Sequence, residues 1–592
     1  MTSKDKVSSL GIEGSKIDFE IEQSKIAGEY ALKLIKEGKS KYILSKYAPR
    51  TKISEHFILD NYNRNMIFVV FGFGFGYGIE KIYKTLGKDV KIIVIEPQEE
   101  ILNAQKELVN LSKFDNITFL SGNDFVEFRD LFAQVFAGYG IFNAVIISHP
   151  HYHLIYDNYL NQILQIINEI HTRAIININT VKKIDQYYVE NCINNSKRIN
   201  TSYDFSCTKD KFKGVPAVIV SAGPSLDKNL AELENFNGII LCAGRTIDSV
   251  RQIGKEPDYV CLLDYSEKIK ATFNKELDVP LVSVFHGSNH IVGDYNGKVH
   301  FVDSNDLCKE LLNIELPEVM TAGSVSTLCL ETAYYMGCDP IVYIGQDLAL
   351  DGDKSYSKTC NIFEDRVANS QIDVSTSSRY SLVEGYYGEA VVSDGAFISC
   401  LRWIEAYIKD RPETTFINST EGGAKIHGTI QMPLKEMIQQ YSDFKKPEVE
   451  TPLLLQEEID VNDLFNQYLL KLDDIQILID EAIDTSKLLS KEYRSYKPSK
   501  SPKKVKKFLK TLDNLDVQMK DKNIMRFIDY LFTKFVLPTM INQDNKDQVT
   551  RSDLDNARAM ADSNIKMYEG LNSATEQVIS VIKNNLEVEE LT

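Results

Sequence analysis

Residues 214–227, GVPAVIVSAGPSLD, hold residue types and a spacing that could bind a phosphate. The apolar run 217–221 predicts a buried strand, and the leucines at 226, 230 and 233 predict a helix directly after it. Gly223 tolerates backbone angles that side chains forbid, Pro224 fixes its φ for helix entry, and Ser225 is a good N-cap. Such a turn aims backbone N–H groups and a helix dipole at one spot, which suits an anion. The alternative is an ordinary turn between a strand and a helix.

Further segments with polar or glycine residues follow predicted strands of the same region. The carboxyl ends of parallel strands meet at one edge of an open α/β sheet, where ligands bind. Arg245 suits a phosphate or a surface ion pair, Asp264 suits ribose hydroxyls, and Asp347 suits either a substrate contact or a helix cap. The remaining candidates are Thr321, Ala322, Gly323 and Ser324 at the start of a predicted helix, Gly345 and Gln346 beside Asp347, and Glu421, Gly422, Gly423 and Lys425 in the loop NSTEGGAKIHG.

A second glycine-rich stretch lies closer to the start of the chain. In MIFVVFGFGFGYGIEKIYKTL, glycines at 72, 74, 76 and 78 separate a predicted strand from a predicted helix, and the next strand ends at Glu96. This is the arrangement of dinucleotide- or adenosyl-binding domains, and it resembles the start of a Rossmann-fold methyltransferase. No further methyltransferase motif is present, although HPHYH (149–153) follows a later strand. We therefore favour a Rossmann-like domain without activity.

The elements that would position these residues fall into consecutive regions of an α/β chain. Apolar spacing in residues 1–60 predicts a peripheral helical segment. Residues 61–205 predict a Rossmann-like domain with a helical linker, and residues 206–435 a central domain with near-continuous apolar strands, as in a parallel sheet covered on both faces. Residues 436–592 predict a helical domain, whose lysine-rich stretch YRSYKPSKSPKKVKKFLKTL is either a solvated face or a docking patch for an acidic partner.

Composition excludes several classes of function. The chain has 592 residues, 43% hydrophobic content and a net charge of −17, which predicts a soluble protein of several domains that does not bind nucleic acid. No signal sequence or membrane span is apparent, and the nine scattered cysteines form no CxxC pair, so we expect buried, reduced thiols in a cytoplasmic protein. The histidines form no metal motif, and we expect no metal site.

Three motifs in order identify a resemblance that extends over nearly the whole chain. GVPAVIVSAGPSLD, TAGSVSTLCLETAYYMGCDPIVYIGQDLALDGDKSYS and INSTEGGAKIHGTIQMPL resemble the motility-associated factor (Maf) glycosyltransferases. The resemblance implies a central Rossmann-like glycosyltransferase domain between an N-terminal Rossmann-like domain and an all-helical C-terminal domain. It also implies transfer of a nonulosonic acid, such as pseudaminic or legionaminic acid, from its CMP-activated form to Ser or Thr of flagellin, as flagellum assembly and motility require. The oligomeric state stays open, a homo-oligomer included.

The central domain is also similar to bacterial CMP-sialic-acid sialyltransferases. Their Gly-Pro-Ser-Leu turn matches Gly223 to Leu226, and their helix start for cytidine and phosphate matches Thr321-Ala322-Gly323. Their Gly-x-Asp strand end matches Gly345 to Asp347, and their tyrosine for the leaving phosphate aligns with Tyr356. These matches imply donor-binding and catalytic roles for the residues named.

The chain departs from the sialyltransferases where their general base lies. The aligned segment VEGYYGEAVVSD (383–394) contains no histidine, which leaves Glu389, Asp394, Glu421 or the pair Tyr386-Tyr387 as candidates. An inverting single displacement needs such a base for the acceptor hydroxyl and hydrogen-bond donors for the departing phosphate. Asp351 and Asp353 have the spacing of a metal clamp, but two acids in a loop are more often solvated, so we expect a metal-independent reaction.

Three other functions stay open at this point. A pterin diphosphokinase would use ATP and magnesium, and archaeal proteins with a related central domain resemble that activity. A flagellin-binding chaperone that has lost catalysis would fit the missing base. A methyltransferase centred on the glycines at 72–78 and Glu96 is the weakest alternative.

Overall fold

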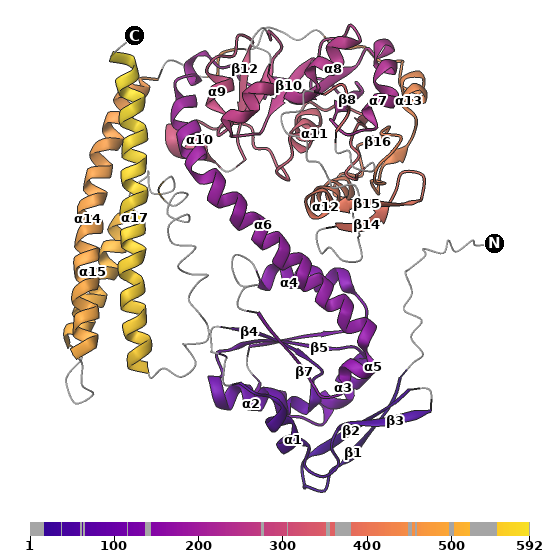
Figure 1. Cartoon of the computed structure of the whole chain (residues 1–592), viewed down its shortest axis with the longest axis vertical. Coiled ribbons are helices and arrows are strands. Elements are labelled where there is room, and N and C mark those ends of the chain that lie inside the picture. Colours follow the sequence, from indigo (N-terminus) through magenta and orange to yellow (C-terminus); the bar gives the residue numbers. More distant parts are fainter. Residues whose placement is uncertain are drawn as a thin grey trace. The chain divides into compact units, whose positions relative to one another are not determined.

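The computed structural model divides the chain into two compact units, Met1–Asn179 with Leu537–Met560, and Thr180–Val536 with Ala561–Thr592. Figure 1 shows the ribbon. Each unit is described by itself. The structure describes residues 17–36, 38–59, 62, 66–114, 116–136, 144–273, 277–304, 306–350, 356–360, 380–447, 453–455, 459–495, 503–520, 528 and 553–590.

The first unit is built on a parallel four-stranded sheet in the order β6-β5-β4-β7. Its strands are β4 (Ile67–Phe71), β5 (Lys91–Glu96), β6 (Ile117–Ser121) and β7 (Ala144–Ser148). Every side chain of β4 is buried, because helices cover both faces of a parallel sheet. The helices of this unit are α1 (Pro49–His56), α2 (Tyr77–Leu86), α3 (Glu99–Glu107), α4 (Phe125–Val135), α5 (Tyr152–Ile155) and the start of α6 (Asp157–Ser196).

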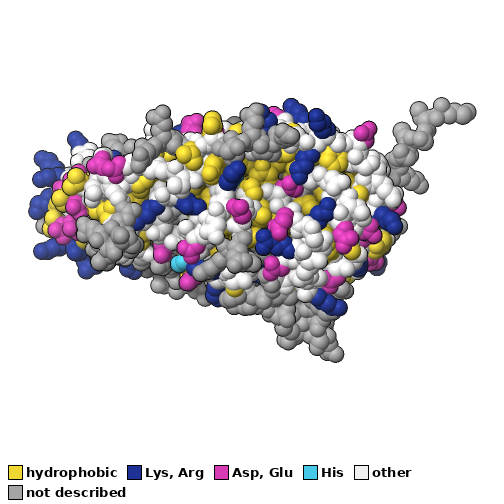
Figure 2. Space-filling model, turned by 90° about the horizontal axis from the view of Figure 1, so that it is seen from above, with side chains coloured by type: hydrophobic (Ala, Val, Ile, Leu, Met, Phe, Trp, Pro, Cys, Tyr) yellow, Lys and Arg dark blue, Asp and Glu magenta, His cyan; other side chains and the backbone are white. Residues whose placement is uncertain are grey.

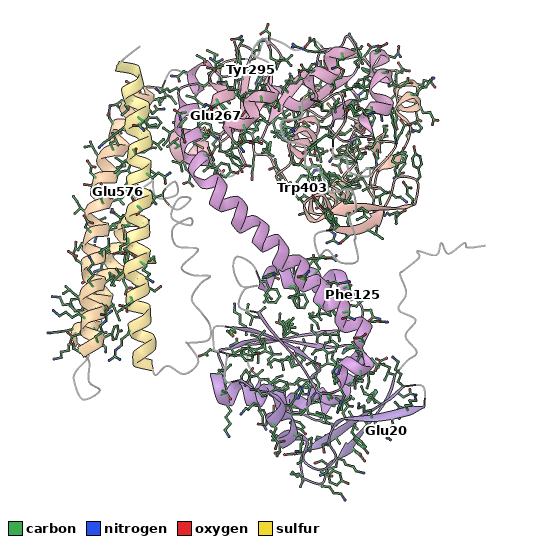
Figure 3. The ribbon with its side chains drawn as sticks, in the orientation of Figure 1. Glu20, Phe125, Glu267, Tyr295, Trp403 and Glu576 are labelled. Carbon is green, nitrogen blue, oxygen red and sulfur yellow. The ribbon has the colours of Figure 1, made fainter. Side chains whose placement is uncertain are left out.

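The expectation of a helical segment over residues 1–60 is wrong for the residues that the structure describes. They form a three-stranded antiparallel sheet of β1 (Asp18–Gln23), β2 (Tyr30–Lys36) and β3 (Lys39–Leu44), followed by the short α1. Burial alternates along this sheet, with Leu32 and Leu34 inside and Glu20, labelled in Figure 3, on the exposed side of β1. The period of two was obscured because Phe19, Ile26, Tyr30 and Leu34 also fit a helical spacing.

The second unit contains an eight-stranded parallel sheet in the order β12-β11-β10-β9-β8-β13-β16-β17. The apolar runs AVIVS, GIILCAG, YVCLLD, LVSVFH, VHFVD, PIVYIGQD and TTFINST each predict a strand, and each contains one. These strands are β8 (Ala217–Val220), β9 (Ile239–Ala243), β10 (Tyr259–Leu262), β11 (Leu281–Val284), β12 (Val299–Val302), β13 (Ile341–Ile344) and β16 (Phe416–Asn418), and β17 (Ile430–Gln431) adds an edge. The strand order reverses between β8 and β13, which makes their carboxyl ends the topological switch point.

Helices cover both faces of this sheet. Along β8, Val218 and Val220 face one core, and Ala217 and Ile219 face the other. The second core is closed by α11 (Val325–Tyr335) and α12 (Gly395–Lys409). The other helices around the sheet are α7 (Leu226–Asn229), α8 (Ile247–Gln252), α9 (Asn289–Val292), α10 (Leu307–Leu312) and α13 (Leu434–Gln440), and a hairpin of β14 (Tyr380–Glu384) and β15 (Ala390–Asp394) precedes α12.

Long helices follow the sheet in the chain, as the apolar patterns predict. They are α14 (Val461–Ser495), α15 (Lys503–Lys520) and α17 (Asp553–Glu590). Arg494 of α14 pairs with Asp562 of α17 at 3.1 Å, and Tyr568 of α17 donates to Asp516 of α15 at 2.7 Å. Buried residues of α14 share one hydrophobic core with the sheet, and the Tyr468 hydroxyl donates to the carbonyl of Leu311 at 2.5 Å. The domain boundary near residue 436 stays a prediction.

No helix in the described parts of the chain combines the length and the apolar character that crossing a membrane requires.

Candidate functional site

A cavity of about 970 Å³ opens at the carboxyl ends of β9, β10 and β11 in the second unit. The start of α11 forms a further wall, and Trp403, labelled on α12 in Figure 3, lines it as well. The lining combines aromatic side chains with a few polar groups, as is typical of small-molecule sites. Its polar and charged residues are Arg245, Asp264, His286, Ser304, Glu318 and Thr321.

Four residues singled out in the sequence line this cavity, namely Arg245, Asp264, Thr321 and Gly323. They come from three separate segments that the sheet brings together. Asp264 follows β10 and accepts a hydrogen bond from the backbone N–H of Ser266 at 2.8 Å, which fixes the carboxylate. The expectation that strand ends converge at one site is therefore met for this set of residues.

The start of α11 presents backbone donors at the cavity wall. Gly323 has a φ of +73°, and a Cβ atom there would meet nothing within 4 Å. The Ala322 N–H is already used, because it donates to the Thr327 hydroxyl at 3.1 Å. The first N–H groups of a helix lack partners within the helix, and α11 is long enough to carry a dipole, so this end favours an anion.

Arg245 adds a positive charge to the same wall. Its Nη1 atom is buried and has no hydrogen-bond partner among the described residues. Its guanidinium lies 5.1 Å from the ring centroid of Tyr356. Tyr356 is therefore beside a cavity residue, although it does not itself line the cavity.

The sequence interpretation missed several lining residues, of which His286 is the most informative. It follows β11 in the run LVSVFHG, whose apolar residues predict a strand but indicate no binding or catalytic role. The side chain is 1% exposed, and burial lowers its pKa to about 3, so the imidazole is neutral. Its position directly after a predicted strand was the feature of the sequence that could have identified this histidine as a site residue. The cavity is also lined by Tyr188, from α6, and by Tyr265 and Phe273, from the loop after β10. No feature of the sequence indicated that these three residues belong to the site.

The turn predicted to cradle phosphate instead holds Asp347. The Asp347 carboxylate is buried and accepts from the Ser225 N–H at 3.3 Å and from the Ser225 hydroxyl at 2.7 Å. A Cβ atom at Gly223 would lie 2.0 Å from Asp347 Oδ2, so the glycine makes room for this carboxylate. The following helix is only α7, a single turn that continues as 3₁₀ helix. A phosphate could bind beside Gly223, Pro224 and Ser225 only by displacing Asp347.

The other predicted residues do not line the cavity, and apart from those at the start of α11 they lie around Asp347 or Glu384. Gln346 accepts from the Ser221 hydroxyl at 2.5 Å, and the Glu421 carbonyl accepts from Lys228 at 3.0 Å. Lys425 pairs with Glu384 at 2.6 Å. Gly345, Gly422 and Gly423 are close to the turn backbone or to Asp347, and Ser324 bonds to Ser326 at the start of α11. The predicted residues therefore form two groups.

The glycine-rich loop of the first unit is filled by the unit's own side chains. A Cβ atom at Gly72 would lie 2.9 Å from the Tyr152 ring, and one at Gly74 would lie 2.2 Å from His149. Corresponding atoms at Gly76 and Gly78 would meet Phe114 and Phe57. Glu96 is buried and accepts from the Tyr152 hydroxyl at 2.8 Å. The HPHYH motif thus supplies His149 and Tyr152, which occupy the space that a nucleotide takes in Rossmann domains.

Among the described residues, no group of three or more His, Cys, Asp or Glu side chains is placed to hold a metal ion. Asp351 and Asp353 lie outside the described residues.

Comparisons with known proteins give two similarities. Residues 190–353 match the family model described as 6-hydroxymethylpterin diphosphokinase MptE-like. The fold is similar to that of the MAf glycosyltransferase from Magnetospirillum magneticum AMB-1, with a TM-score of 0.52 and 12% sequence identity over 94% of this chain and 90% of that chain. At that identity the likeness concerns the fold. A search of curated proteins found no significant match.

Proposed function

We propose that this protein is a glycosyltransferase that moves a nonulosonic acid from a CMP-activated donor to a Ser or Thr hydroxyl of flagellin. One observation carries the proposal. A cavity lined by Arg245, Asp264 and the start of α11 lies at the strand ends of a chain whose fold is similar to that of a glycosyltransferase over 94% of its length. The protein would act in the cytoplasm, before flagellin is exported, and would thereby support flagellum assembly and motility.

The cavity offers a partner for each part of such a donor. Asp264 would accept hydrogen bonds from the ribose hydroxyls, and the start of α11 at Thr321–Ser324 would receive the phosphate. The unpartnered Nη1 of Arg245 would bind the phosphate or the sugar carboxylate. A volume of about 970 Å³ is large enough for a nucleotide sugar.

The proposed reaction is a single displacement. The acceptor oxygen bonds to the anomeric carbon while the bond from that carbon to the phosphate oxygen breaks, and the configuration inverts. The departing phosphate is already a good leaving group and needs only hydrogen-bond donors, for which Tyr356 and the start of α11 are placed near Arg245. This chemistry needs no metal.

Donor turnover with purified components tests this proposal. We expect release of CMP from a CMP-nonulosonate in the presence of flagellin, at the same rate with excess EDTA. Arg245→Ala should raise the KM for the donor about tenfold, since one charge-assisted contact is lost. Arg251→Ala on α8, whose guanidinium pairs with Glu256, serves as the matched control. An absence of CMP release with folded protein would contradict the proposal.

A second candidate function is a pterin diphosphokinase, which the family-model match over residues 190–353 favours. That enzyme would transfer diphosphate from ATP to a hydroxymethyl pterin and release AMP. Magnesium-dependent formation of AMP with the pterin, together with no CMP release from the nonulosonate donor, would favour this reading over ours.

A further inference from the structure

His286 occupies a place in the cavity that suits proton transfer. Its side chain is almost completely buried, and its Nδ1 atom has no hydrogen-bond partner among the described residues. Leaving a buried polar atom unpaired is unfavourable, so a partner is expected from a bound molecule. The cavity that His286 lines is the space from which such a partner would come.

The turn that carries His286 is held by two amide side chains of α6. Asn191 Nδ2 donates to the His286 carbonyl at 3.0 Å. Asn195 Nδ2 donates to the carbonyls of Phe285 and Gly287, both at 2.8 Å. Three consecutive carbonyls are thus fixed from one helix, a degree of support that suits a residue whose position matters for chemistry.

The imidazole itself is held by aromatic packing. The Tyr188 ring meets it edge to face, with the ring centroids 4.1 Å apart. The charged and titratable groups that share its cavity are Arg245, Cys261, Asp264, Tyr265 and Glu318, besides Tyr188. Burial keeps the imidazole neutral, and the neutral imidazole is the form that accepts a proton.

We propose that His286 is the general base that takes the proton from the acceptor hydroxyl. The inference rests on the proposed glycosyl transfer. As the acceptor oxygen bonds to the anomeric carbon and CMP leaves with the bonding electron pair, the hydroxyl proton passes to an imidazole nitrogen. The negative charges of the donor stabilise the imidazolium, and the oxocarbenium-like carbon makes the attacking hydroxyl more acidic, so a weak base suffices.

The other acids of the cavity fit this role less well. Asp264 is already bonded to the Ser266 N–H and is assigned to the ribose. Glu318 is solvent-exposed, so water competes for its carboxylate. Glu389, Asp394, Glu421 and the pair Tyr386-Tyr387, which the sequence left open as bases, do not line the cavity.

The test compares His286→Gln with His300→Gln. His300 is also a buried histidine, on the adjacent β12, but its Nδ1 lies 3.1 Å from the Tyr203 carbonyl and it does not line the cavity. We expect His286→Gln to lower kcat by about 10²–10⁴-fold, with CMP affinity and the KM for the donor changed less than about threefold. His300→Gln should keep kcat within about threefold of wild type. A His286→Gln kcat close to that of wild type, or a large loss in Glu318→Gln alone, would overturn the proposal.

A second measurement needs no variant of His286. The negative charges of the bound donor should raise the pKa of His286 from about 3 back toward its ordinary 6.5. With saturating donor, the kcat of the wild type should therefore fall as the pH drops through a single ionisation between about pH 4.5 and 6.5, because the base must be neutral. A kcat that is constant from about pH 4.5 to 8 would overturn the proposal. Failure of the wild type to transfer at all would instead refute the proposed function, so the two failures are distinguishable.

Discussion

At the residue scale, Asp347 shows how a plausible ligand site can be satisfied internally. The sequence predicted a free N–H cradle at Gly223–Ser225, and the structure fills it with the carboxylate of Asp347, which follows the neighbouring strand β13. Because the two strands flank the switch point, the carboxylate also ties them together. Asp347 thus connects the turn to the backbone of Gly423 and Ala424 through its own main chain.

Asp347→Asn should therefore act on stability. The neutral amide loses charge-assisted bonds to Ser225, and we expect the free energy of unfolding to fall by about 1–3 kcal/mol in urea titrations. Ser225→Ala, which removes only the hydroxyl bond, should cost about 1 kcal/mol. If Asp347→Asn unfolds like the wild type but abolishes transfer, Asp347 contacts substrate, and the structural role proposed for it is wrong.

Tyr356 is predicted to serve the leaving phosphate. Its ring centroid lies 5.1 Å from the guanidinium of Arg245, which lines the cavity, and we propose that its hydroxyl donates to the phosphate bound there. We expect Tyr356→Phe to lower kcat by about 10²-fold, as when one donor to a developing anion is removed. The exposed Tyr47 of the first unit provides a control, and Tyr47→Phe should leave kcat unchanged. Equal kcat values in the two variants would remove Tyr356 from the mechanism.

At the element scale, the loop between β4 and α2 keeps the Rossmann geometry but not the open space. Glu96, at the end of β5, accepts from the Phe73 N–H at 3.2 Å as well as from Tyr152, and both bonds reach Oε2. Burial raises the pKa of Glu96 to about 7. The acid that would bind a ribose in a working site is thus a buried group of the core that is partly protonated near neutral pH.

This pKa predicts a local dependence of stability on pH. The pKa is higher in the folded unit than the ordinary 4.5, so the folded state binds the proton more tightly. The resulting stabilisation is complete below about pH 4.5 and is lost as the pH rises through about 7, by up to about 3 kcal/mol. Hydrogen exchange of the β4 and β5 amides should therefore quicken over this range in the wild type and much less in Glu96→Gln. The same pH dependence in both proteins would contradict the assignment.

The filled loop also predicts that the first unit binds no adenosyl cofactor. We expect no shift in the unfolding temperature with S-adenosylmethionine or NAD at millimolar concentration, because His149 and Tyr152 fill the space beside the glycines of the loop. Gly74→Ala should destabilise the unit, since its Cβ would lie 2.2 Å from His149 at a φ of +55°. A clear shift with either cofactor would show that the aromatic side chains move aside, and would revive the methyltransferase alternative.

Elements with strong patterns could be predicted from the sequence, and contacts between distant elements could not. Strands such as β8 and β13 are apolar on both faces, which makes them visible as continuous runs. β1 and β2 are short, so only a few residues show the alternation of a strand. The apolar residues there also fit a helical spacing, and this led to the wrong prediction of a helix. Arg245, Asp264 and Thr321 were found because each stands at a strand end or helix start. The partner of Ser225, and the cavity position of His286, depend on which strands lie side by side, and one sequence does not contain that order.

At the scale of the whole molecule, the residues proposed to bind the donor and to transfer the sugar all belong to the second unit. The cavity and all the residues proposed for transfer lie within residues 188–403 of that unit. On the face shown in Figure 2, Lys and Arg side chains gather at the left end, and acidic and basic side chains are interspersed over the rest. The choice of flagellin as the partner depends on the cavity and the fold, and an assay with flagellin tests it directly.

The most direct test is the intact mass of flagellin co-expressed with this protein and a pathway that makes a CMP-nonulosonate. The account predicts an added mass of one or more nonulosonic acid residues with the wild type, much less with Arg245→Ala, and none without the donor pathway. Flagellin of unmodified mass, with folded wild-type protein and donor both present, would contradict the central claim. Co-purification of the two proteins in that case would identify a flagellin-binding chaperone.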